Sequence, residues 1–362
     1  MLADSSRLTI DLNALAGNLG AIRAEAAGVE VAAVVKADGY GLGAAQVARR
    51  LWAEGVRSFY VARLTEGEAL RAALGPDREA AILVLDGLPP GSGPRLLAAG
   101  LVPVLASPVQ VEAAVALAAG AGRTLTCALH VDTGMNRQGL TPQETAALAQ
   151  APGRLRGLHV DLLLSHLGSA TAPAHPRNAL QLERFNAVRA LFPDSRASFA
   201  ASAGVFLGRS YRFDQVRGGI SLYGGGPEER PDPRFRAVAT FEAPILDVRS
   251  VEPGELMGYG EGVRAERPTR LAVVGAGYAD GLIRAARGGY AWYAGARRRL
   301  VYVTMDLTAI EIGDAPARIG EMVELLGPHA PIDELAAAAG TVAHECLVRL
   351  GGRGERVYLG EV

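Results

Sequence analysis

The stretch Val31-Ala-Ala-Val-Val-Lys36-Ala-Asp-Gly-Tyr40-Gly-Leu-Gly43 determines how the rest of the chain is interpreted. Its first five residues are small or β-branched and apolar, which predicts a strand that is buried on both faces, as in a parallel sheet. A glycine-rich turn follows, and residues 44–54 then have helical spacing. The strand ends at Lys36, whose amine is costly to bury without a function.

Lys36 has two interpretations. An amine at the carboxyl end of a buried parallel strand, beside small residues and one tyrosine, suits a Schiff base with a carbonyl cofactor. A lysine at a strand end can equally extend its amine into water. This segment alone does not decide between them.

Strands and helices alternate through the first two thirds of the chain. A short extended segment (8–11) and a helical one (13–27) come first. The expected strands cover residues 31–36, 58–62, 81–85, 102–106, 125–131, 158–165, 197–200 and 215–219. Helical patterns between them include 44–54, 66–73, 108–119, 143–150 and 178–191. Eight strands separated by helices predict a closed (β/α)8 TIM-like barrel rather than an open doubly wound sheet.

The pattern changes after Gly226. The segment Pro227-Glu-Glu-Arg-Pro-Asp-Pro233 is rich in proline and charge, as linkers are. Short extended runs follow at 237–245, 270–276, 300–305, 309–312 and 322–326, with one helix at 332–338 introduced by Pro331. We therefore expect a barrel domain over 1–230 and a smaller, mainly β domain over 231–362, on which the first short strand packs.

Composition restricts the partners. The chain has 37 basic and 38 acidic residues, so no strong field favours nucleic acid or an anionic membrane. Small molecules and a second copy of the chain are the expected partners. Only two cysteines, Cys127 and Cys346, are present, and neither a signal peptide nor a membrane span is apparent. These features predict a cytoplasmic protein.

Polar residues follow several of the expected barrel strands. Asp132 and Arg137 follow the fifth strand, His166 the sixth and Ser202 the seventh, while Arg217 lies in the eighth. Chemistry in such barrels collects at the carboxyl ends of the strands, where Lys36 also stands. The sequence therefore predicts one site at the barrel mouth.

Five stretches, spread over most of the chain, resemble those of alanine racemases. They are 34–43, His130-Val-Asp-Thr-Gly-Met-Asn-Arg137, Ser165-His166-Leu167, Arg217-Gly-Gly-Ile-Ser-Leu-Tyr-Gly224 and Gly277-Tyr-Ala-Asp-Gly281, with Met257-Gly-Tyr-Gly260 and Met305-Asp306 as further landmarks. The resemblance implies a barrel followed by a β domain, pyridoxal 5′-phosphate (PLP) as cofactor and a homodimer. It also implies interconversion of L- and D-alanine, an isomerase activity that supplies a cell-wall precursor.

The resemblance assigns two catalytic residues. Lys36 carries the cofactor and is one acid/base group, while Tyr259 of the partner subunit is the other. Inverting a Cα requires that a proton leaves one face and returns on the opposite face, which one base cannot easily do. Without the resemblance, Tyr259 reads as a turn tyrosine between Gly258 and Gly260.

The resemblance also assigns cofactor contacts. Arg217 faces the pyridine nitrogen and leaves it unprotonated, because a guanidinium does not give up its proton. His166 lies beside Arg217, although a satisfied core histidine is the alternative. The phosphate contacts are Tyr40, Ser202 and the backbone N–H groups of Gly219 and Ile220. Ser202 alone also fits a helix N-cap.

On the substrate side, the resemblance places Arg137 near the phenolic oxygen of the cofactor. The backbone N–H of Met305 binds the substrate carboxylate across the dimer interface, and Asp306 borders it. Tyr278 and Arg284 line the access corridor, although Arg284 fits an ordinary surface role equally well.

Several positions depart from the family pattern. His130 replaces a lysine that can be carbamylated, and Ala201 replaces an asparagine. Tyr302 replaces a corridor arginine, and His344 stands where the family has a tyrosine. Residues 168–171 lack the usual acidic residues. These changes leave room for relaxed substrate specificity.

Three alternatives remain open. The chain could racemise another amino acid, such as serine. His344-x-Cys346 could ligate zinc in a lyase or dehydratase of D-3-hydroxy amino acids, although the main interpretation assigns no metal. A non-catalytic PLP-binding protein would keep the lysine and the barrel but lack the β domain that supplies Tyr259.

Overall fold

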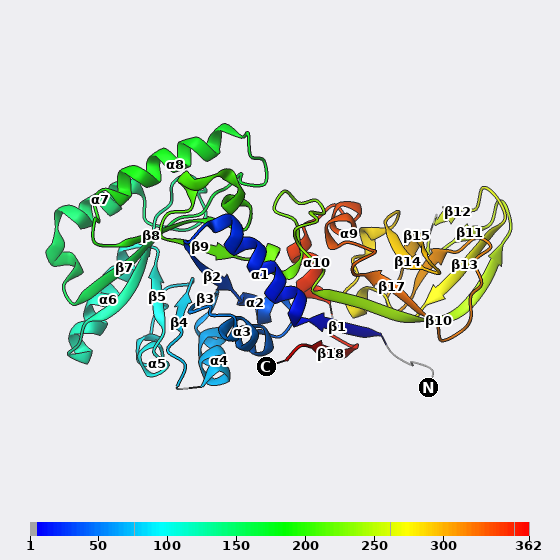
Figure 1. The fold of residues 1–362 in the computed structure, drawn as a ribbon, viewed down its shortest axis with the longest axis horizontal. Coiled ribbons are helices and arrows are strands. Elements are labelled where there is room, and N and C mark those ends of the chain that lie inside the picture. The colour runs from blue at the N-terminus through cyan, green and yellow to red at the C-terminus, as the bar shows by residue number, and fades with distance from the viewer. Residues whose placement is uncertain (1–5, 76, 261, 351, 362) are drawn as a thin grey trace. The chain divides into compact units, whose positions relative to one another are not determined.

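The computed structural model describes residues 6–75, 77–260, 262–350 and 352–361 (Figure 1). They form two compact units. The barrel unit contains residues 19–39 and 43–222. Of the described residues, those within 6–18, 40–42 and 223–361 form the C-terminal unit. No helix among the described residues is long and apolar enough to cross a membrane.

The barrel unit contains a closed barrel of eight parallel strands, each paired with the next in sequence order. The strands are β2 (Glu30–Val34), β3 (Ser58–Val61), β4 (Ala81–Val84), β5 (Val102–Leu105), β6 (Leu125–His130), β7 (Leu158–Leu164), β8 (Arg196–Ala201) and β9 (Gln215–Gly218). Strand β9 pairs with β2 and closes the barrel. The predicted (β/α)8 barrel is confirmed, with strand ends within two residues of those expected.

Helices connect the strands, and α3 to α8 lie outside the barrel (Figure 1). The helices of this part of the chain are α1 (Leu12–Ala26), α3 (Ala44–Ala53), α4 (Leu64–Leu74), α5 (Gly93–Ala98), α6 (Pro108–Ala121), α7 (Pro142–Gln150) and α8 (Pro176–Arg189). The element labelled α2 (Lys36–Tyr40) is a turn with left-handed φ values rather than a regular α-helix. Short 3-10 turns are η1 (Pro152–Leu155), η2 (Ala203–Leu207), η3 (Arg209–Tyr211) and η4 (Ile220–Tyr223). Helix α5 was not expected, since it is brief and flanked by glycine and proline.

Local sequence explains where these helices begin. In α7 the Thr141 hydroxyl accepts a hydrogen bond from the N–H of Glu144 (3.1 Å), and the Glu144 carboxylate accepts one from the N–H of Thr141 (2.8 Å). This capping box satisfies two backbone donors that the helix itself leaves unpaired, and Pro142 fits the first turn because its missing N–H is not needed there.

The C-terminal unit is mainly β, as expected. Its main sheet has the order β13-β16-β15-β14-β17-β10-β1-β18, and β10 also pairs with β13. The strands are β1 (Arg7–Asp11), β10 (Ala239–Val251), β13 (Thr269–Val274), β14 (Tyr290–Tyr293), β15 (Ala296–Val303), β16 (Thr308–Glu311), β17 (Met322–Leu326) and β18 (Glu355–Leu359). A separate hairpin joins β11 (Leu256–Met257) to β12 (Val263–Arg264). Helical segments are η5 (Tyr278–Asp280), η6 (Arg284–Ala286), α9 (Ile332–Ala338) and α10 (Ala343–Arg349).

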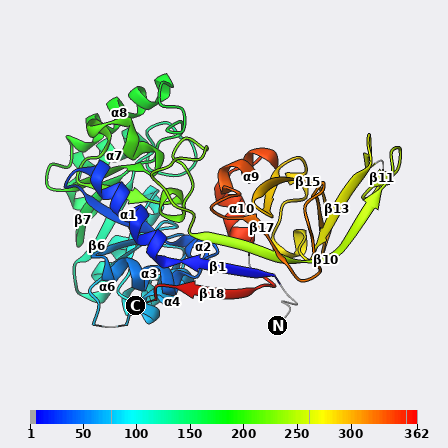
Figure 2. The same cartoon turned by 45° about the vertical axis from the view of Figure 1, so that its right-hand side comes forward.

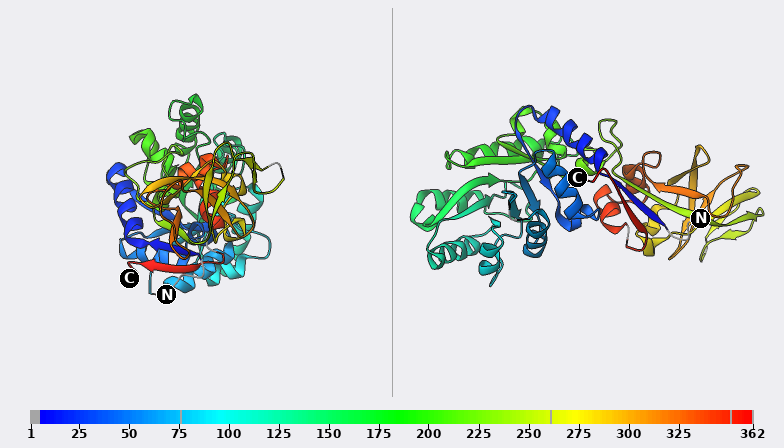
Figure 3. Two further views of the ribbon diagram at one scale, coloured as in Figure 1. Left: turned by 90° about the vertical axis from the view of Figure 1, so that its right-hand side faces the viewer. Right: turned by 60° about the horizontal axis from the view of Figure 1, so that its bottom comes forward.

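Strand β1 belongs to this sheet. It pairs antiparallel with β10 and parallel with β18, so the first and last strands of the described chain lie side by side (Figures 2 and 3). Strands β14 and β18 and helix α10 were not expected. The sequence obscures β15 in particular, because three consecutive arginines (297–299) hide the alternation of its side chains.

Candidate active site

Lys36 follows β2 and begins the turn that leaves the barrel strand. The strand itself ends two residues earlier, at Val34, so the expected end at residue 36 was too late. The lysine is half-buried, and its amine has no hydrogen-bond or ion-pair partner among the described residues. Burial and then the charge of Arg137 lower the pKa of this amine, whereas Glu66 and Asp86 act in the opposite direction. A larger fraction of the amine is therefore in the nucleophilic, unprotonated form.

Composition carries a second signal at this residue. Of the 37 lysine and arginine residues in the chain, 36 are arginine, and Lys36 is the only lysine. A guanidinium can replace an ammonium in most ion pairs, but it cannot act as an amine nucleophile. The chain thus keeps lysine at the one position where an amine at the barrel mouth is available.

The turn after Lys36 has an unusual backbone. Ala37, Asp38, Gly39 and Tyr40 all have left-handed φ values, between 53° and 62°. This conformation costs about 1–2 kcal/mol for each residue that is not glycine. Asp38 supports the turn, because its carbonyl accepts the N–H of Gly43 (2.8 Å) and its carboxylate accepts the N–H of Ala44 (2.8 Å). Backbone strain of this kind concentrates at functional sites.

Glu66 ties this turn to the next strand. One carboxylate oxygen accepts the N–H of Ala37 (2.9 Å), and the other accepts those of Ala62 (2.7 Å) and Arg63 (3.2 Å). A single side chain thereby fixes the backbone beside Lys36 to the end of β3. Sequence reasoning missed this role, although Glu66 at the third position of α4 carried a capping signal.

Asp132 shapes the turn after β6. Its Oδ1 accepts hydrogen bonds from the N–H groups of Gly134 (2.8 Å), Met135 (2.8 Å) and Asn136 (3.2 Å). The next residue, Arg137, is exposed, and its guanidinium has no hydrogen-bond or ion-pair partner among the described residues. Asp132 is therefore engaged by its own turn, and Arg137 keeps an uncompensated charge.

Two histidines lie near these cations. His130, the last residue of β6, is buried, and its Nδ1 has no hydrogen-bond partner within the described part of the chain. Burial, followed by the charges of Arg217 and Arg137, lowers the pKa of His130 to about 4. Burial and the same arginines also hold the pKa of His166 well below its ordinary value. Both imidazoles are consequently neutral at neutral pH.

Arg217, in β9, is buried among neutral acceptors. Its Nη1 donates to the carbonyl (3.0 Å) and the hydroxyl (2.7 Å) of Ser198, and its Nη2 donates to the carbonyl of Ser165 (2.6 Å). Nη2 also lies 3.4 Å from Nδ1 of His166, so the predicted proximity of these two residues is observed. None of the described residues forms a carboxylate ion pair with Arg217. Burial lowers its pKa, yet a guanidinium remains charged.

Ser202 joins the loops that follow β8 and β9. Its hydroxyl accepts hydrogen bonds from the N–H groups of Gly219 (2.9 Å) and Ser221 (3.3 Å). It does not cap η2, as the N-cap alternative would have required. Ile220 begins η4, where N–H groups of a first turn have no partner within the turn itself, whereas the N–H of Gly219 is already bonded to Ser202.

These residues fit a cofactor such as PLP. Lys36, Arg137 and Arg217 supply three cations without carboxylate partners in the described part of the barrel, and His130 supplies a buried, unpartnered ring nitrogen. An anionic ligand with an aldehyde, a ring nitrogen and a phosphate matches this set of donors.

The remaining candidates lie in the C-terminal unit. Tyr259 occupies the tip of the β11–β12 hairpin and is 77% exposed. It borders a cavity of about 600 Å³ that Arg284 and Tyr302 also line. Tyr302, the residue that departs from the family arginine, lies against Gly258, because a Cβ placed there would be 3.3 Å from the Tyr302 ring.

Tyr278, Met305 and Asp306 lie together. The N–H of Tyr278 bonds to the carbonyl of Thr304, and the N–H of Ala279 bonds to the carbonyl of Met305, both at 2.9 Å. The Met305 residue is 54% exposed. The carboxylate of Asp306 accepts a hydrogen bond from Arg353 at 2.6 Å. The Asp306 charge is thus compensated locally.

Tyr40 packs within the C-terminal unit. Its ring stacks on Tyr223 at 4.5 Å and lies 5.8 Å from the ring of His344. Burial raises the pKa of the Tyr40 hydroxyl, which therefore stays protonated. His344, which replaces a family tyrosine, is thus a neighbour of one of the predicted phosphate contacts.

The zinc hypothesis rested on His344 and Cys346. Both lie on α10, two residues apart, where side chains do not face each other. His344 is exposed, whereas Cys346 is buried. Among the described residues, no group of three or more His, Cys, Asp or Glu side chains is arranged to hold a metal ion.

Comparisons with known proteins cover nearly the whole chain. Residues 10–227 match the family model of the alanine racemase N-terminal domain, and residues 238–358 match that of the alanine racemase C-terminal domain. An alanine racemase of Methylobacterium sp. (strain 4-46) is 45% identical over 98% of each chain. A catabolic alanine racemase of Mesorhizobium japonicum is 43% identical over 98% of this chain and 93% of that protein.

Solved structures give the same result. The alanine racemase of Bartonella henselae, which carries covalently bound pyridoxal phosphate, has a TM-score of 0.92 at 34% identity and covers 99% of this chain and 100% of its own. The biosynthetic alanine racemase of Pseudomonas aeruginosa has a TM-score of 0.90 at 34% identity, with coverage of 99% and 100%.

Proposed function

We propose, from the premise that this chain belongs to the alanine racemase family, that Lys36 and Tyr259 are the two acid/base groups of its reaction. The chain is a PLP-dependent racemase that interconverts L- and D-alanine. The observation that carries the residue assignment is the single lysine of the chain, placed at the barrel mouth with a free amine of lowered pKa.

Lys36 serves one face of the substrate Cα. When PLP is bound, its ring accepts the electron pair that remains on Cα after the proton has left. The amine of Lys36 is unprotonated more often than an exposed lysine, because burial and Arg137 disfavour its charged form. It therefore removes the Cα proton of one enantiomer. In the reverse direction it returns a proton to the same face and forms that enantiomer again.

Tyr259 of the partner subunit serves the opposite face. Its exposed position on a hairpin tip suits a side chain that reaches into a neighbouring molecule. An ordinary tyrosine has a pKa near 10 and needs cations close by to act as a base at neutral pH. Lys36, Arg137 and Arg217 supply such an environment at the barrel mouth.

The remaining side chains hold the cofactor. Arg217 remains protonated and donates toward the ring nitrogen, with His166 beside it. Arg137, whose charge is uncompensated, donates a hydrogen bond to the phenolic oxygen. Tyr40, which burial keeps protonated, donates to the phosphate. Ser202, Gly219 and Ile220 complete the phosphate contacts from the loops after β8 and β9.

The substrate carboxylate binds at the N–H of Met305 across the dimer interface, bordered by Asp306 and with Tyr278 in the access corridor. An acidic side chain beside a carboxylate site would repel the substrate. The bond from Arg353 to Asp306 removes this objection, because it compensates the Asp306 charge.

The racemase activity has a direct test. The purified protein is incubated with PLP and L-alanine, and the enantiomers are resolved by chiral chromatography. We expect D-alanine to accumulate until the two enantiomers are about equal. No D-alanine above background would count heavily against the assignment.

Sharing of the site in a homodimer can be tested separately. Lys36→Ala and Tyr259→Phe are each inactive on this account, but a mixed dimer has one site with both residues intact. Unfolding, mixing and refolding equal amounts should recover about a quarter of the wild-type activity, since half of the dimers are mixed and each has one good site. No recovery would place the two residues in the same subunit.

Substrate range is the least constrained part of the proposal. Tyr302 lines the cavity beside Tyr259, where the family carries an arginine, and residues 168–171 carry no acid. We expect alanine to be the best substrate, with measurable turnover of serine and other small amino acids. A racemisation screen over Ala, Ser, Lys and Arg tests this, and strict alanine specificity would contradict it.

Two alternatives have weaker support. The zinc-dependent lyase lacks a shared face for His344 and Cys346. A non-catalytic PLP carrier would lack a C-terminal domain, and this chain has one over residues 238–358. We place the enzyme in the cytoplasm, as two free, buried cysteines fit a reducing compartment.

A further inference from the structure

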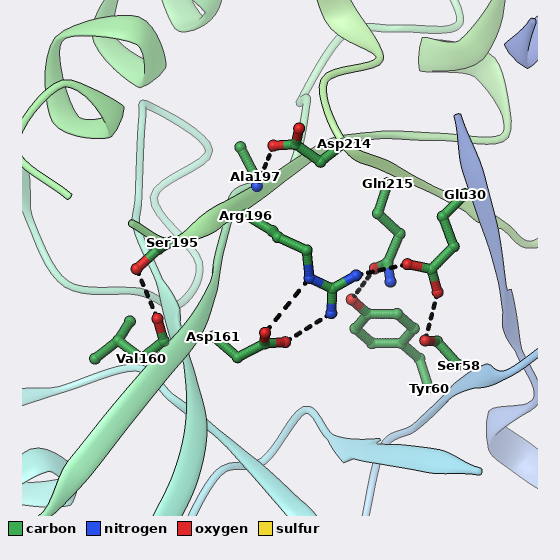
Figure 4. Close-up of polar contacts among 10 residues, drawn as sticks. All are labelled: Glu30, Ser58, Tyr60, Val160, Asp161, Ser195, Arg196, Ala197, Asp214 and Gln215. Carbon is green, nitrogen blue, oxygen red and sulfur yellow. Dashed lines mark hydrogen bonds and ion pairs between the residues drawn. The ribbon is translucent and has the colours of Figure 1, made fainter. Parts of the chain in front are cut away.

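The interior of the barrel contains a column of polar side chains below Arg217. Barrel interiors are usually filled by layers of apolar residues. Here Tyr60 of β3, Ser198 of β8 and Gln215 of β9 occupy the layer beneath Arg217, and all three are at most 1% exposed. Ser198 and Gln215 are direct neighbours in the sheet. Figure 4 shows Tyr60 and Gln215 facing each other inside the barrel.

Hydrogen bonds connect this column to Arg217. Nη1 of Arg217 donates to Oγ of Ser198 at 2.7 Å. Oη of Tyr60 donates to Oε1 of Gln215 at 2.6 Å, which fixes the Tyr60 ring in this layer. The guanidinium carbon of Arg217 lies 5.9 Å from the centre of the Tyr60 ring. We call Ser198, Tyr60 and Gln215 the Arg217 support.

Donor chemistry fixes the direction of the bond to Arg217. A guanidinium only donates, so the Ser198 hydroxyl accepts from Arg217. Tyr60 in turn donates to Gln215, and 2.6 Å is the usual length of an O–H···O bond. The Ser198 oxygen therefore presents a lone pair to Arg217, and the bond to Gln215 holds the Tyr60 ring beside the guanidinium. The Nε2 of Gln215 finds no partner among the described residues, which is the cost of this orientation.

Neutral acceptors leave the charge of Arg217 uncompensated. The nearby acids of the barrel base, Glu30 and Asp161, are each bonded to Arg196 at 2.6 Å. A carboxylate in the place of Tyr60 would satisfy the buried guanidinium but would also neutralise it. The support satisfies its N–H groups and leaves the positive charge available at the mouth.

We propose that Tyr60, Ser198 and Gln215 are positioning residues that orient the Arg217 guanidinium toward the cofactor ring with its charge uncompensated. This inference rests on the proposed role of Arg217 at the ring nitrogen. The support itself touches neither cofactor nor substrate and acts only through Arg217.

The first test uses PLP-free protein, so that it does not depend on the reaction. In protein labelled with 15N-arginine, the Arg217 guanidinium signal is assigned by its loss in Arg217→Lys. Tyr60→Phe keeps the ring and removes only the hydroxyl. We expect hydrogen exchange of the Arg217 N–H groups to speed up about fivefold to tenfold, the value of one hydrogen bond. Ser58→Ala, which removes a bond to Glu30 at the barrel base, is the control and should leave the exchange unchanged.

The second test uses the PLP-loaded enzyme. Tyr60→Phe should shift the absorption maximum of the bound cofactor and lower kcat with little change in KM, whereas Ser58→Ala should do neither. Adding Tyr60→Phe to Arg217→Lys should have no further effect. If the protein fails to bind PLP or to racemise alanine, the proposed function is wrong. Hydrogen exchange of the Arg217 N–H groups in the PLP-free protein still tests whether the Arg217 support positions the guanidinium.

A second variant covers the case in which Tyr60→Phe does not fold. If Tyr60→Phe is not folded by circular dichroism, Gln215→Met replaces it, because this change removes the terminal acceptor at nearly constant volume. Wild-type exchange in a folded Tyr60→Phe or Gln215→Met protein would overturn the proposal. Equal acceleration in Ser58→Ala would overturn it as well, since it would show a general loosening of the barrel.

Discussion

The two ends of the barrel treat positive charge in opposite ways. At the base, Arg196 bonds to both Asp161 and Glu30, and the bond to Asp161 raises its pKa (Figure 4). At the mouth, Lys36 and Arg217 have no carboxylate bonded to them among the described residues, and burial lowers the pKa of both. The cation at the base is therefore paired within the fold, whereas under the proposed function those at the mouth bind a ligand.

The overall composition does not reveal this difference. The chain has a formal net charge of −1, because acidic residues elsewhere offset the positive charges at the mouth. A local excess of cations in a site with few water molecules strengthens binding of an anion far more than net charge suggests. The changes below probe this contrast, from the largest expected effect to the smallest.

Removing the amine of the mouth should have the largest effect. Lys36→Ala should lower the racemisation rate by about 10⁴-fold or more, because both the cofactor attachment and one acid/base group are lost. Lys36→Arg keeps the charge but not the amine, and we expect no rescue. Chiral chromatography of the reaction measures both variants. Activity of Lys36→Arg within tenfold of wild type would show that charge alone suffices at this position.

Replacing one arginine at each end of the barrel compares the roles of mouth and base directly. Arg217→Met should weaken PLP binding about 10-fold to 100-fold, the usual range for losing hydrogen bonds to a charged group. Arg196→Met, the matched change at the base, should leave PLP affinity unchanged. Fluorescence titration of PLP-free protein gives both values. Similar losses in the two variants would remove the distinction between mouth and base.

His130 makes the mouth sensitive to acid. Its pKa in the folded protein is about 4, against 6.5 for an ordinary histidine. The unfolded chain therefore binds more protons in this window, so lowering the pH from 6.5 toward 4 removes stability. Between pH 7.5 and pH 5 the loss should be about 2 kcal/mol of unfolding free energy.

Urea unfolding of wild type and His130→Gln at both pH values isolates this contribution. The glutamine variant should lack about 2 kcal/mol of the pH dependence, while the contributions of other groups, His166 included, remain in both proteins. Identical pH dependence in the two proteins would mean that His130 is not held neutral by its surroundings.

The smallest effect is expected at the base. Arg196 is 43% exposed and its carboxylate partners 36% and 30%, so solvent screens these ion pairs. Arg196→Met should lower the unfolding free energy by about 1 kcal/mol or less, with a smaller difference in high salt. Urea unfolding at low and high salt measures it, and a loss of catalysis without a loss of stability would contradict the structural role.

The barrel could be predicted because its signals are local. Apolar runs that end at polar residues gave each of the eight strands, and the helix at 332–338 has the expected bounds. Strand β18 and helix α10 were missed because glycines and charged residues interrupt their patterns. Strand β18 is part of the sheet through its pairing with β1, more than 340 residues away in the sequence.

For the candidate site, the sequence predicted the residues in motifs but not the residues that support them. Lys36, Arg217 and Ser202 stand in recognisable motifs, so sequence alone nominated them. Their supports did not stand out, since the contact between Tyr60 and Gln215 spans 155 residues and exists only once the barrel closes. The one global signal was the single lysine, which a count of residue types would have found.

We propose that the mouth of this barrel holds PLP through Lys36. Borohydride reduction of the PLP-loaded protein, followed by peptide mass mapping, tests it most directly. Because Lys36 is the only lysine, the account predicts one pyridoxyl-phosphate label per chain, on the peptide that contains residue 36, and none in Lys36→Arg. A label at any other position, or an unlabelled Lys36 in an active enzyme, would contradict it.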